Sequence, residues 1–239
     1  MTKIAIMQPT FIPWMGYFAM IDFVDTFVFL DDVQFVKRSW QCRNQIKSAN
    51  GALMLHLEML GTQHRPLIKD ARLHARDFEN RLFKSIEHNL KKAPYFDIAY
   101  HCLIESFKES DRSLVRLNQG FIQRICDLAS IQTNFVNSSE LVINGLSKSA
   151  RLFEICKKLN ARTYISPQGS ADYLKIENFF DDSEVELQFF NFEHPRYQQL
   201  YGTFLPFMSV IDLVSNIASG DLKEILRSGI KPALNIDQV

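Results

Sequence analysis

The sequence predicts an α/β protein with a doubly wound, mostly parallel sheet and a helical insertion. Three observations support this fold class. Short apolar runs alternate with helical patterns at both ends of the chain, the middle carries helical patterns alone, and polar residues follow the ends of the apolar runs. The 239 residues are expected to form a single domain, 1–239, with the insertion at about 75–130.

The N-terminal segment has the pattern of a strand, a helix and a second strand. The run KIAIMQ, residues 3–8, is apolar and closed by Pro9, as in a buried strand. Residues 16–24 have helical spacing, and TFVFLDD, residues 26–32, predicts a strand that ends in carboxylates. So short a unit predicts parallel strands with a right-handed crossover. The alternating run LMLHLEML, residues 53–60, predicts a third strand.

The middle of the chain is predicted to be helical. A first helix should stop near Pro94, a second should cover about 98–107, and Ser113 is placed to cap a third over 114–129. The first and third carry apolar residues three or four positions apart, which are Phe78, Leu82, Ile86 and Leu90, then Leu114, Leu117, Phe121, Ile125 and Leu128.

Strand and helix patterns alternate again after the insertion. The predicted elements are, in order, a strand at 133–138, a helix at 148–160 capped by Ser147, a strand at 163–166, a helix at 171–180, a strand at 185–192, and helices at 207–218 and 222–228. This alternation completes a doubly wound sheet.

The balance of charge excludes some partners. Lysine and arginine number 27, as do aspartate and glutamate, so bulk electrostatic binding to DNA or to an anionic membrane is not expected. The N-terminus lacks the pattern of a signal peptide, and no apolar run reaches the ~18 residues of a membrane span. Four widely spaced cysteines predict reduced thiols. A cytoplasmic protein without membrane insertion is therefore expected.

Several common site motifs are absent from the sequence. It has no G-x-G-x-x-G, Walker, G-x-S-x-G or H-E-x-x-H motif, and only nine glycines, so a glycine-rich phosphate cradle is not expected. None of the six histidines pairs with a cysteine at zinc-finger spacing. No metal site is predicted from these residues.

Polar residues cluster where the predicted strands end. Ligands of doubly wound sheets collect outside the carboxyl ends of the strands, so this edge is the predicted binding site. The residues expected to contact a substrate or phosphate there are Gln8, Ser139, Ser166 and Gln168, with Arg151 at the start of the helix that follows Ser139. Helix capping is the competing interpretation for Ser139 and Arg151.

The stretch DDVQFVKRSWQCRNQI, residues 31–46, is the strongest candidate for a site. Arginine offers a planar fork for phosphate oxygens, lysine adds a point charge, and tryptophan can stack on a base or a sugar. The residues expected to bind in this way are Lys37, Arg38, Trp40, Arg43 and Asn44. A nucleotide-linked sugar would use all of them. The competing interpretation is a surface loop whose cations pair with Asp31, Asp32 and Asp70.

Three residues are candidates for proton transfer. Asp31 and Asp32 end a buried strand at the predicted ligand edge, where one could act as a general base, orient a nucleophile or hold a metal with phosphates. Adjacent residues on a strand point to opposite faces, so at most one should face the substrate. His64, in the loop GTQHRPLIKD, is the histidine expected to act as a base, because its unperturbed pKa lies near neutrality.

A resemblance to a known family covers nearly the whole chain. The run IAIMQPTFIPWMGYFAMIDFVDTFVFLDDVQFVKRSWQCRNQI, residues 4–46, closely resembles the opening of the WbqC-like family of bacterial O-antigen and polysaccharide clusters. The likeness continues through HRPLIKDARL, KAPYF, LNQGFIQRICDLASIQTNF, RLFEICKKLNARTYIS and YQQLYGTFLPFMSVIDLVSN. The resemblance implies an aminoacyl (glycine) transferase that acts on a sugar of the surface polysaccharide.

A fainter resemblance concerns architecture. A first strand closed by proline, followed by FIPWMGYFAMI at a helix start, is similar to the nucleotidylyltransferase and pantothenate-synthetase group, which implies a nucleotidylyltransferase-like or Rossmann-like fold. That group holds phosphates with H-x-G-H, whereas residues 14–17 here are W-M-G-Y. Trp14 and Tyr17 are the nearest substitutes for the histidines, so Tyr17 is expected to contact the substrate or its phosphate, although neither residue can carry positive charge to a departing phosphate.

Three functions remain open at this point. The first is transfer of an aminoacyl or related acyl group to a nucleotide-linked amino sugar, with ATP plus a free amino acid, charged tRNA or a coenzyme A thioester as donor. ATP with Mg²⁺ would be the cofactor if the acyl group is activated in place. The second is nucleotidyl or phosphoryl transfer, and the third is a non-catalytic nucleotide-sugar-binding subunit. A homo-oligomer is compatible with each.

Overall fold

The fold was obtained as a computed structural model. It describes residues 2–61, 65–74, 77–143, 145–146, 148–177, 179–180 and 183–239. The predicted base His64 and the predicted cap Ser147 lie outside the described residues.

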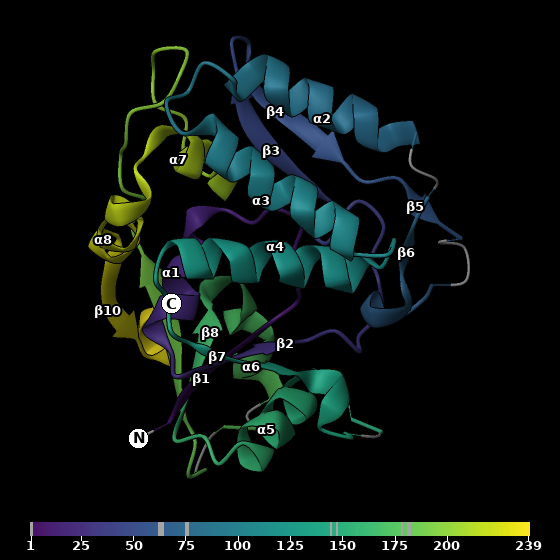
Figure 1. Ribbon diagram of the computed structural model, residues 1–239. Coiled ribbons are helices and arrows are strands. Elements are labelled where there is room, and N and C mark those ends of the chain that lie inside the picture. The colour runs from purple at the N-terminus through teal and green to yellow at the C-terminus, as the bar shows by residue number, and fades with distance from the viewer. Residues whose placement is uncertain are drawn as a thin grey trace.

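The centre of the molecule is a mostly parallel six-stranded sheet (Figure 1), as the sequence predicts. Its strands are, in spatial order, β10 (Ile230–Leu234), β9 (Glu186–Phe192), β8 (Thr163–Pro167), β1 (Lys3–Met7), β2 (Thr26–Phe29) and β7 (Asn134–Asn137). Only β10 is antiparallel to its neighbour. The chain builds outward from β1 to β7, then returns to β8 on the other side of β1. The point where the direction reverses lies between β1 and β8.

Both faces of the sheet are covered, because neighbouring residues on a strand point to opposite sides. Phe27 and Phe29 of β2 belong to one hydrophobic core, whereas Val28 between them belongs to the other. Tyr164 and Ile165 of β8 divide in the same way. The apolar runs that predicted the strands are thus continuous because both faces are buried.

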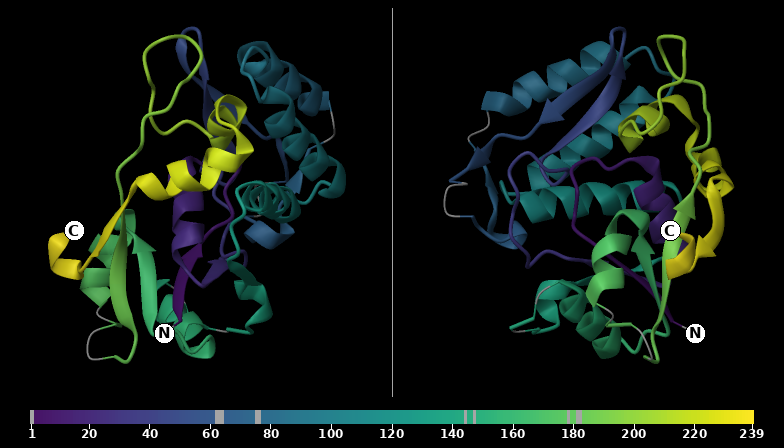
Figure 2. Two further views of the ribbon diagram at one scale, coloured as in Figure 1. Left: turned by 60° about the vertical axis from the view of Figure 1, so that its left-hand side comes forward. Right: turned by 180° about the vertical axis from the view of Figure 1, so that it is seen from behind.

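The helices fall into two layers (Figures 1 and 2). The larger core contains residues of α1 (Met15–Phe23), α2 (Asp77–Leu90), α3 (Phe96–Glu109), α4 (Leu114–Leu128), α7 (Val210–Asn216) and α8 (Leu222–Ser228). The smaller core contains residues of α5 (Lys148–Lys158) and α6 (Ala171–Glu177). Ser113 caps α4 as predicted, since its side chain accepts a hydrogen bond from the Arg116 N–H.

The segment between β2 and β7, residues 30–133, forms the layer that stands above the sheet in Figure 1. It contains α2 to α4 and four strands outside the sheet, which are β3 (Arg43–Ser48), β4 (Gly51–His56), β5 (Met59–Leu60) and β6 (Arg72–Leu73). The predicted single strand at 53–60 is wrong. The strand β4 ends at His56, and it pairs with β3 rather than with the central sheet.

Candidate functional site: a cleft at the carboxyl edge of the sheet

Three adjoining cavities meet at Met7, the last residue of β1. We name them by residues that only one of them contains: the Phe207 lobe of about 380 Å³, the Gln168 lobe of about 280 Å³ and the Tyr173 lobe of about 300 Å³. Met7 lines all three. This is the edge, and the point of strand reversal, at which doubly wound sheets bind ligands. We call the three lobes together the cleft.

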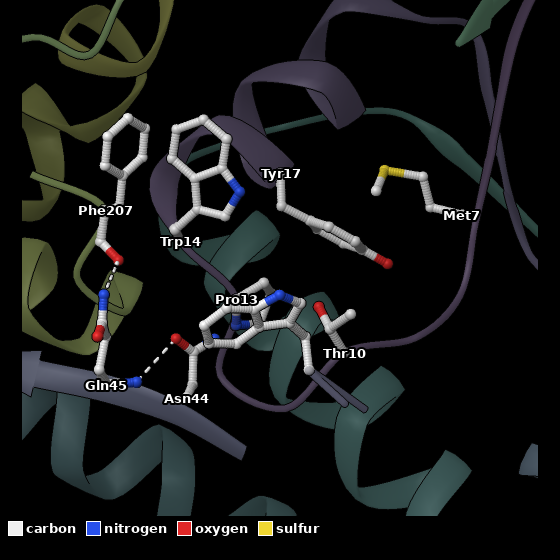
Figure 3. A pocket seen from close by; sticks show the side chains of 9 residues that line it. Met7, Thr10, Pro13, Trp14, Tyr17, Asn44, Gln45 and Phe207 are labelled. Carbon is white, nitrogen blue, oxygen red and sulfur yellow. Dashed lines mark hydrogen bonds between the residues drawn. The ribbon is translucent and has the colours of Figure 1, made fainter. Parts of the chain in front are cut away.

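The Phe207 lobe has aromatic walls (Figure 3). Its lining residues are Met7, Thr10, Pro13, Trp14, Tyr17, Trp40, Asn44, Gln45 and Phe207. The rings of Trp14 and Phe207 lie side by side, with their centroids 5.3 Å apart. Gln45 Nε2 donates to the Phe207 carbonyl at 3.4 Å and so ties that ring to β3. Flat apolar walls of this kind suit a base or a sugar ring.

Asn44 holds the floor of the Phe207 lobe in place. Its Nδ2 donates to the carbonyls of Phe11 and Ile12 at 2.9 and 3.0 Å. Ile12 has a φ of 37°, a conformation that β-branched residues rarely adopt, so the two hydrogen bonds stabilise a strained loop. Asn44 was predicted to bind substrate. The structure places it in the lining, but with both amide protons engaged by the protein.

The loops after β1 and β2 are joined by side chains. Gln41 Nε2 donates to Gln8 Oε1 at 2.8 Å, and Asn118 Nδ2 donates to the carbonyls of Pro9 and Gln41 at 3.0 and 2.9 Å. Gln8 lines the Tyr173 lobe, as expected of a substrate-binding residue at the strand end. Gln41 also lines the Tyr173 lobe, whereas Asn118 contributes by fixing these loops, and no sequence pattern indicated either role.

Trp14 closes the start of α1, the position at which phosphate would bind if the predicted nucleotidylyltransferase-like resemblance held. A Cβ on Gly16 would lie only 2.2 to 2.5 Å from three atoms of the Trp14 ring, so the indole rests directly on the first turn of the helix. An anion can approach the free N–H groups of a helix start only if no side chain covers them. The ring therefore occupies the space that a phosphate would need.

We expect Gly16→Ala to lower the free energy of unfolding by about 1–3 kcal/mol, because its methyl group forces the Trp14 ring out of its place. Chemical denaturation measures the change. Gly120→Ala is the matched control, since Gly120 is also helical and the nearest atom to its added Cβ, at 3.9 Å, is in ordinary contact. Equal stability of the two variants would contradict this packing.

Asp31 and Asp32 lie in a network that joins the ends of β2 and β7. The Ser139 N–H and hydroxyl donate to Asp31 at 2.9 and 2.7 Å, and the Ser138 hydroxyl lies 2.5 Å from Asp32 Oδ1 and 3.1 Å from Asp31 Oδ1. Arg151 forms an ion pair with Asp32 and donates to the Ile143 carbonyl. The predicted residues are therefore together, although none of them is in the lining of the three lobes.

The network nevertheless adjoins the cleft. Leu30 and Leu152, the chain neighbours of Asp31 and Arg151, both line the Tyr173 lobe. Asp31 is 4% exposed, and the Arg151 and Asp32 side chains are 11% and 13% exposed. Because these carboxylates are enclosed and their oxygens already accept hydrogen bonds, they are better suited to fixing the structure of the cleft wall than to accepting a proton from a substrate.

The basic residues of the turn after β2 are not gathered around one hollow. Lys37 and Arg38 are exposed, and neither forms an ion pair or a side-chain hydrogen bond with a described residue. Arg43 is half-buried, and its guanidinium carbon lies 5.5 Å from the ring centroid of Trp40. Its Nε is buried and finds no partner among the described residues. Trp40 itself is 49% exposed and lines both the Phe207 and the Tyr173 lobes.

The remaining predicted contacts differ in accessibility. The hydroxyl of the buried Tyr17 donates to the Gln8 carbonyl at 3.1 Å, and burial raises the pKa of Tyr17 well above its ordinary value, so it stays protonated. Gln168 is exposed, lines its lobe and donates to the Phe190 carbonyl at 3.2 Å. Ser166 is fully buried, and its hydroxyl oxygen lies 2.5 Å from that of Ser170.

His194 is a residue at the site that the sequence did not indicate. Its ring stacks on Trp14 at a centroid distance of 5.9 Å and meets the edge of Phe207 at 5.4 Å. Nδ1 donates to the Pro195 carbonyl at 2.8 Å, which leaves Nε2 as the lone-pair nitrogen, buried and without a partner among the described residues. Burial lowers the pKa of His194, so the imidazole is neutral at pH 7.

The stability of the protein should therefore depend on His194 in mildly acidic solution. A histidine whose pKa is lowered by folding stabilises the protein above its unfolded pKa, about 6.5, and this contribution is lost as the pH falls below that value and through the lowered pKa of the folded state. His194→Gln should lose less stability between pH 7 and pH 5 than the wild type, as measured by denaturant unfolding. The control, His56→Gln at an exposed position of β4, should keep the wild-type dependence.

Other features place limits on the chemistry. Within the described residues, no group of three or more histidine, cysteine, aspartate or glutamate side chains is arranged to hold a metal ion. The four cysteines are free thiols. None of the helices in the described ranges has the length and apolarity needed to cross a bilayer.

The fold and the cleft together define a class: an α/β protein with an aromatic-walled cleft at the point of strand reversal. The chain belongs to the WbqC-like protein family, whose model matches residues 8–224. It is also 31% identical over 223 residues to the uncharacterized protein Rv1507c of Mycobacterium tuberculosis, covering 92% of this chain and 95% of that protein. No solved structure matches the chain, so assignment to a Rossmann-like or nucleotidylyltransferase-like fold stays a prediction.

Proposed function

We propose that the protein is a transferase of bacterial surface polysaccharide (O-antigen) biosynthesis, which adds an acyl or aminoacyl group to a nucleotide-linked amino sugar. The observation that carries the proposal is the Trp40–Arg43 pair at the junction of two lobes. One face of an exposed indole is backed by a guanidinium, and the indole borders both an aromatic and a more polar compartment. In a nucleotide-linked sugar, the base requires an aromatic compartment, the diphosphate requires a cation, and the sugar requires a more polar compartment.

The substrate is proposed to bind across Trp40. Its base would lie in the Phe207 lobe between aromatic rings, and its diphosphate would pass the cationic turn of Lys37, Arg38 and Arg43. Its sugar would enter the Tyr173 lobe, where Gln8 Nε2 has no hydrogen-bond partner among the described residues and the Ser39 hydroxyl remains able to donate to sugar oxygens. Neutral hydrogen-bonding groups of this kind orient a sugar without a fixed charge.

The reaction is an acyl transfer. The sugar amine attacks the acyl carbonyl, a C–N bond forms, the bond to the leaving group breaks, and the amine loses one proton. We assign Asp31, Asp32 and Arg151 to positioning of the Tyr173 lobe, because their polar atoms are engaged with one another and with Ser138 and Ser139. Tyr17 stays protonated and serves as a donor. His64 remains the proposed base.

Mass spectrometry of products tests the proposal. The purified protein is incubated with a panel of UDP- and dTDP-linked amino sugars, each with an acyl thioester or with glycine, ATP and Mg²⁺. A gain of one acyl or aminoacyl unit on the sugar supports it, and the donor that is consumed names the activation chemistry. Pyrophosphate release without modification of the sugar would favour nucleotidyl transfer, against which the closed start of α1 counts.

A second function is favoured by one observation: of the two carboxylates predicted to act as bases, Asp31 is buried, Asp32 is partly buried, and each of their oxygens has a hydrogen-bond partner. A non-catalytic subunit that binds a nucleotide sugar would need the cleft but no base. This alternative predicts tight binding of the sugar nucleotide by calorimetry with no product in any of the incubations.

A further inference from the structure

No charged side chain lines the Gln168 lobe, as is true of the other two lobes, and fewer amide and hydroxyl side chains line it than line either neighbour. It lies between α1, β9 and the turn after β8, and its lining residues are Met7, Trp14, Gly16, Tyr17, Met20, Pro167, Gln168, Gly169, Phe190 and Phe192. The one amide and the one hydroxyl side chain of the lining already have partners, since Gln168 donates to the Phe190 carbonyl and Tyr17 to the Gln8 carbonyl. A ligand group in this lobe should therefore be uncharged and mostly apolar.

The lobe also has a definite place relative to the other two. It shares Met7, Trp14 and Tyr17 with the Phe207 lobe, and Met7 and Pro167 with the Tyr173 lobe. A chain bound in it would thus reach Met7, where a sugar in the Tyr173 lobe also ends. Its volume of about 280 Å³ is just below the range of about 300–1,000 Å³ for sites that hold a whole drug-sized ligand. The lobe fits one group of a larger molecule.

We propose that the Gln168 lobe is the donor pocket, which takes the short apolar acyl chain of a thioester and presents its carbonyl carbon at Met7. This assignment rests on the proposed acyl transfer. In the step, the sugar amine attacks the carbonyl carbon, a C–N bond forms, the C–S bond breaks with its electron pair on sulfur, and the proton lost by the amine ends on the leaving thiol. No oxidation or reduction takes place.

The absence of charge in the lining distinguishes between donors. An acyl adenylate carries a phosphate, and an aminoacyl donor carries an ammonium group next to its carbonyl. Either charge would be buried here without an opposite partner, at a high cost in free energy. The cationic side chains nearest in sequence to the site, at residues 37, 38 and 43, are outside the lining of all three lobes. An alkyl chain in the Gln168 lobe would meet Met7, Met20, Pro167 and aromatic rings.

Gly169 offers a way to fill the lobe without disturbing the fold. It lines the lobe, its φ is an ordinary negative value, and an added Cβ would meet no atom within 4 Å. Gly220 is a matched control, because it has the same open surroundings and also lies in the middle of a short 3₁₀ helix directly before an α-helix. Thermal unfolding should show both leucine variants folded, and Gly169→Ala serves as a smaller step.

The test measures binding of N-acetylcysteamine thioesters from acetyl to hexanoyl by calorimetry. In the wild type and in Gly220→Leu, affinity should rise roughly fourfold for each added methylene until the lobe is full. Gly169→Leu should abolish this rise and weaken hexanoyl binding at least tenfold, with Gly169→Ala between the two. UDP-glucosamine should bind all variants alike. A flat response of the wild type to chain length, or a rise that Gly169→Leu preserves, would overturn the donor pocket.

The same measurements separate this inference from the proposed function. Thioester binding that depends on chain length without any binding of sugar nucleotides would retain the acyl pocket and reject the acceptor. Sugar nucleotide binding and glycyl transfer with no affinity for thioesters would retain the transferase and reject the acyl pocket.

Discussion

Arg151→Met is expected to lower the free energy of unfolding by about 3–5 kcal/mol, because it leaves the enclosed carboxylate of Asp32 without its opposite charge. The side chains of the pair are only 11% and 13% exposed, so water cannot replace the guanidinium. Loss of the ion pair should also alter the cleft. Leu152 lines the Tyr173 lobe, and α5 would no longer be tied to the end of β2.

An exposed ion pair provides the comparison. Arg81 and Glu58 are 71% and 49% exposed, and Arg81→Met should change stability by less than about 1 kcal/mol. Denaturant unfolding at pH 7 measures both variants. Adding Asp32→Asn to Arg151→Met should restore part of the loss, since the buried charge is then removed. If Arg151→Met is as stable as Arg81→Met, the pair does not hold the sheet edge together.

Trp40→Ala is expected to weaken binding of UDP-glucosamine by a factor of about 10 to 100, the effect of removing one aromatic stacking partner worth about 1–3 kcal/mol. The indole borders two lobes and carries Arg43 on one face, so its removal takes away the stacking surface and frees the guanidinium. Because Trp40 is 49% exposed, the fold should tolerate the change.

Val36→Ala is the matched control for this variant. Val36 lies on the same turn, is 53% exposed and is absent from the lining of the three lobes, while its backbone N–H, which donates to Gln41, is kept. Calorimetric titration should give wild-type affinity for Val36→Ala. Equal affinities for the two variants would remove Trp40 from the binding surface and with it the main support for the proposed substrate.

The central sheet could be predicted because its inner strands are buried on both faces and therefore appear as apolar runs. Other strands could not, and β10 and β3 show why. β10 is an exposed edge strand that contains Pro232, a residue that strand interiors exclude. β3 contains Asn44 and Lys47, which are 5% and 3% exposed, so buried polar side chains hide its strand character.

The sequence predicted the edge of the sheet at which the site lies, but it did not predict the contacts among the residues of the site. The rule for doubly wound sheets identified the carboxyl ends of the strands, and the residues brought together there include Asp31, Asp32, Ser139 and Arg151. Their engagement with one another depends on pairs more than a hundred positions apart in sequence. No local pattern encodes such distances. His194 was missed for the same reason, since only the folded chain sets its ring against Trp14.

Asn118 shows where the specificity of such a protein can change. One amide on α4 fixes the loops after β1 and β2, two of the segments that border the cleft, although α4 belongs to the layer that departs from the sheet after β2. The sheet alone would keep its strand order and lose its binding surface. We therefore expect new ligand preferences to arise from changes at the junction between the two layers, while the strands of the sheet stay the same.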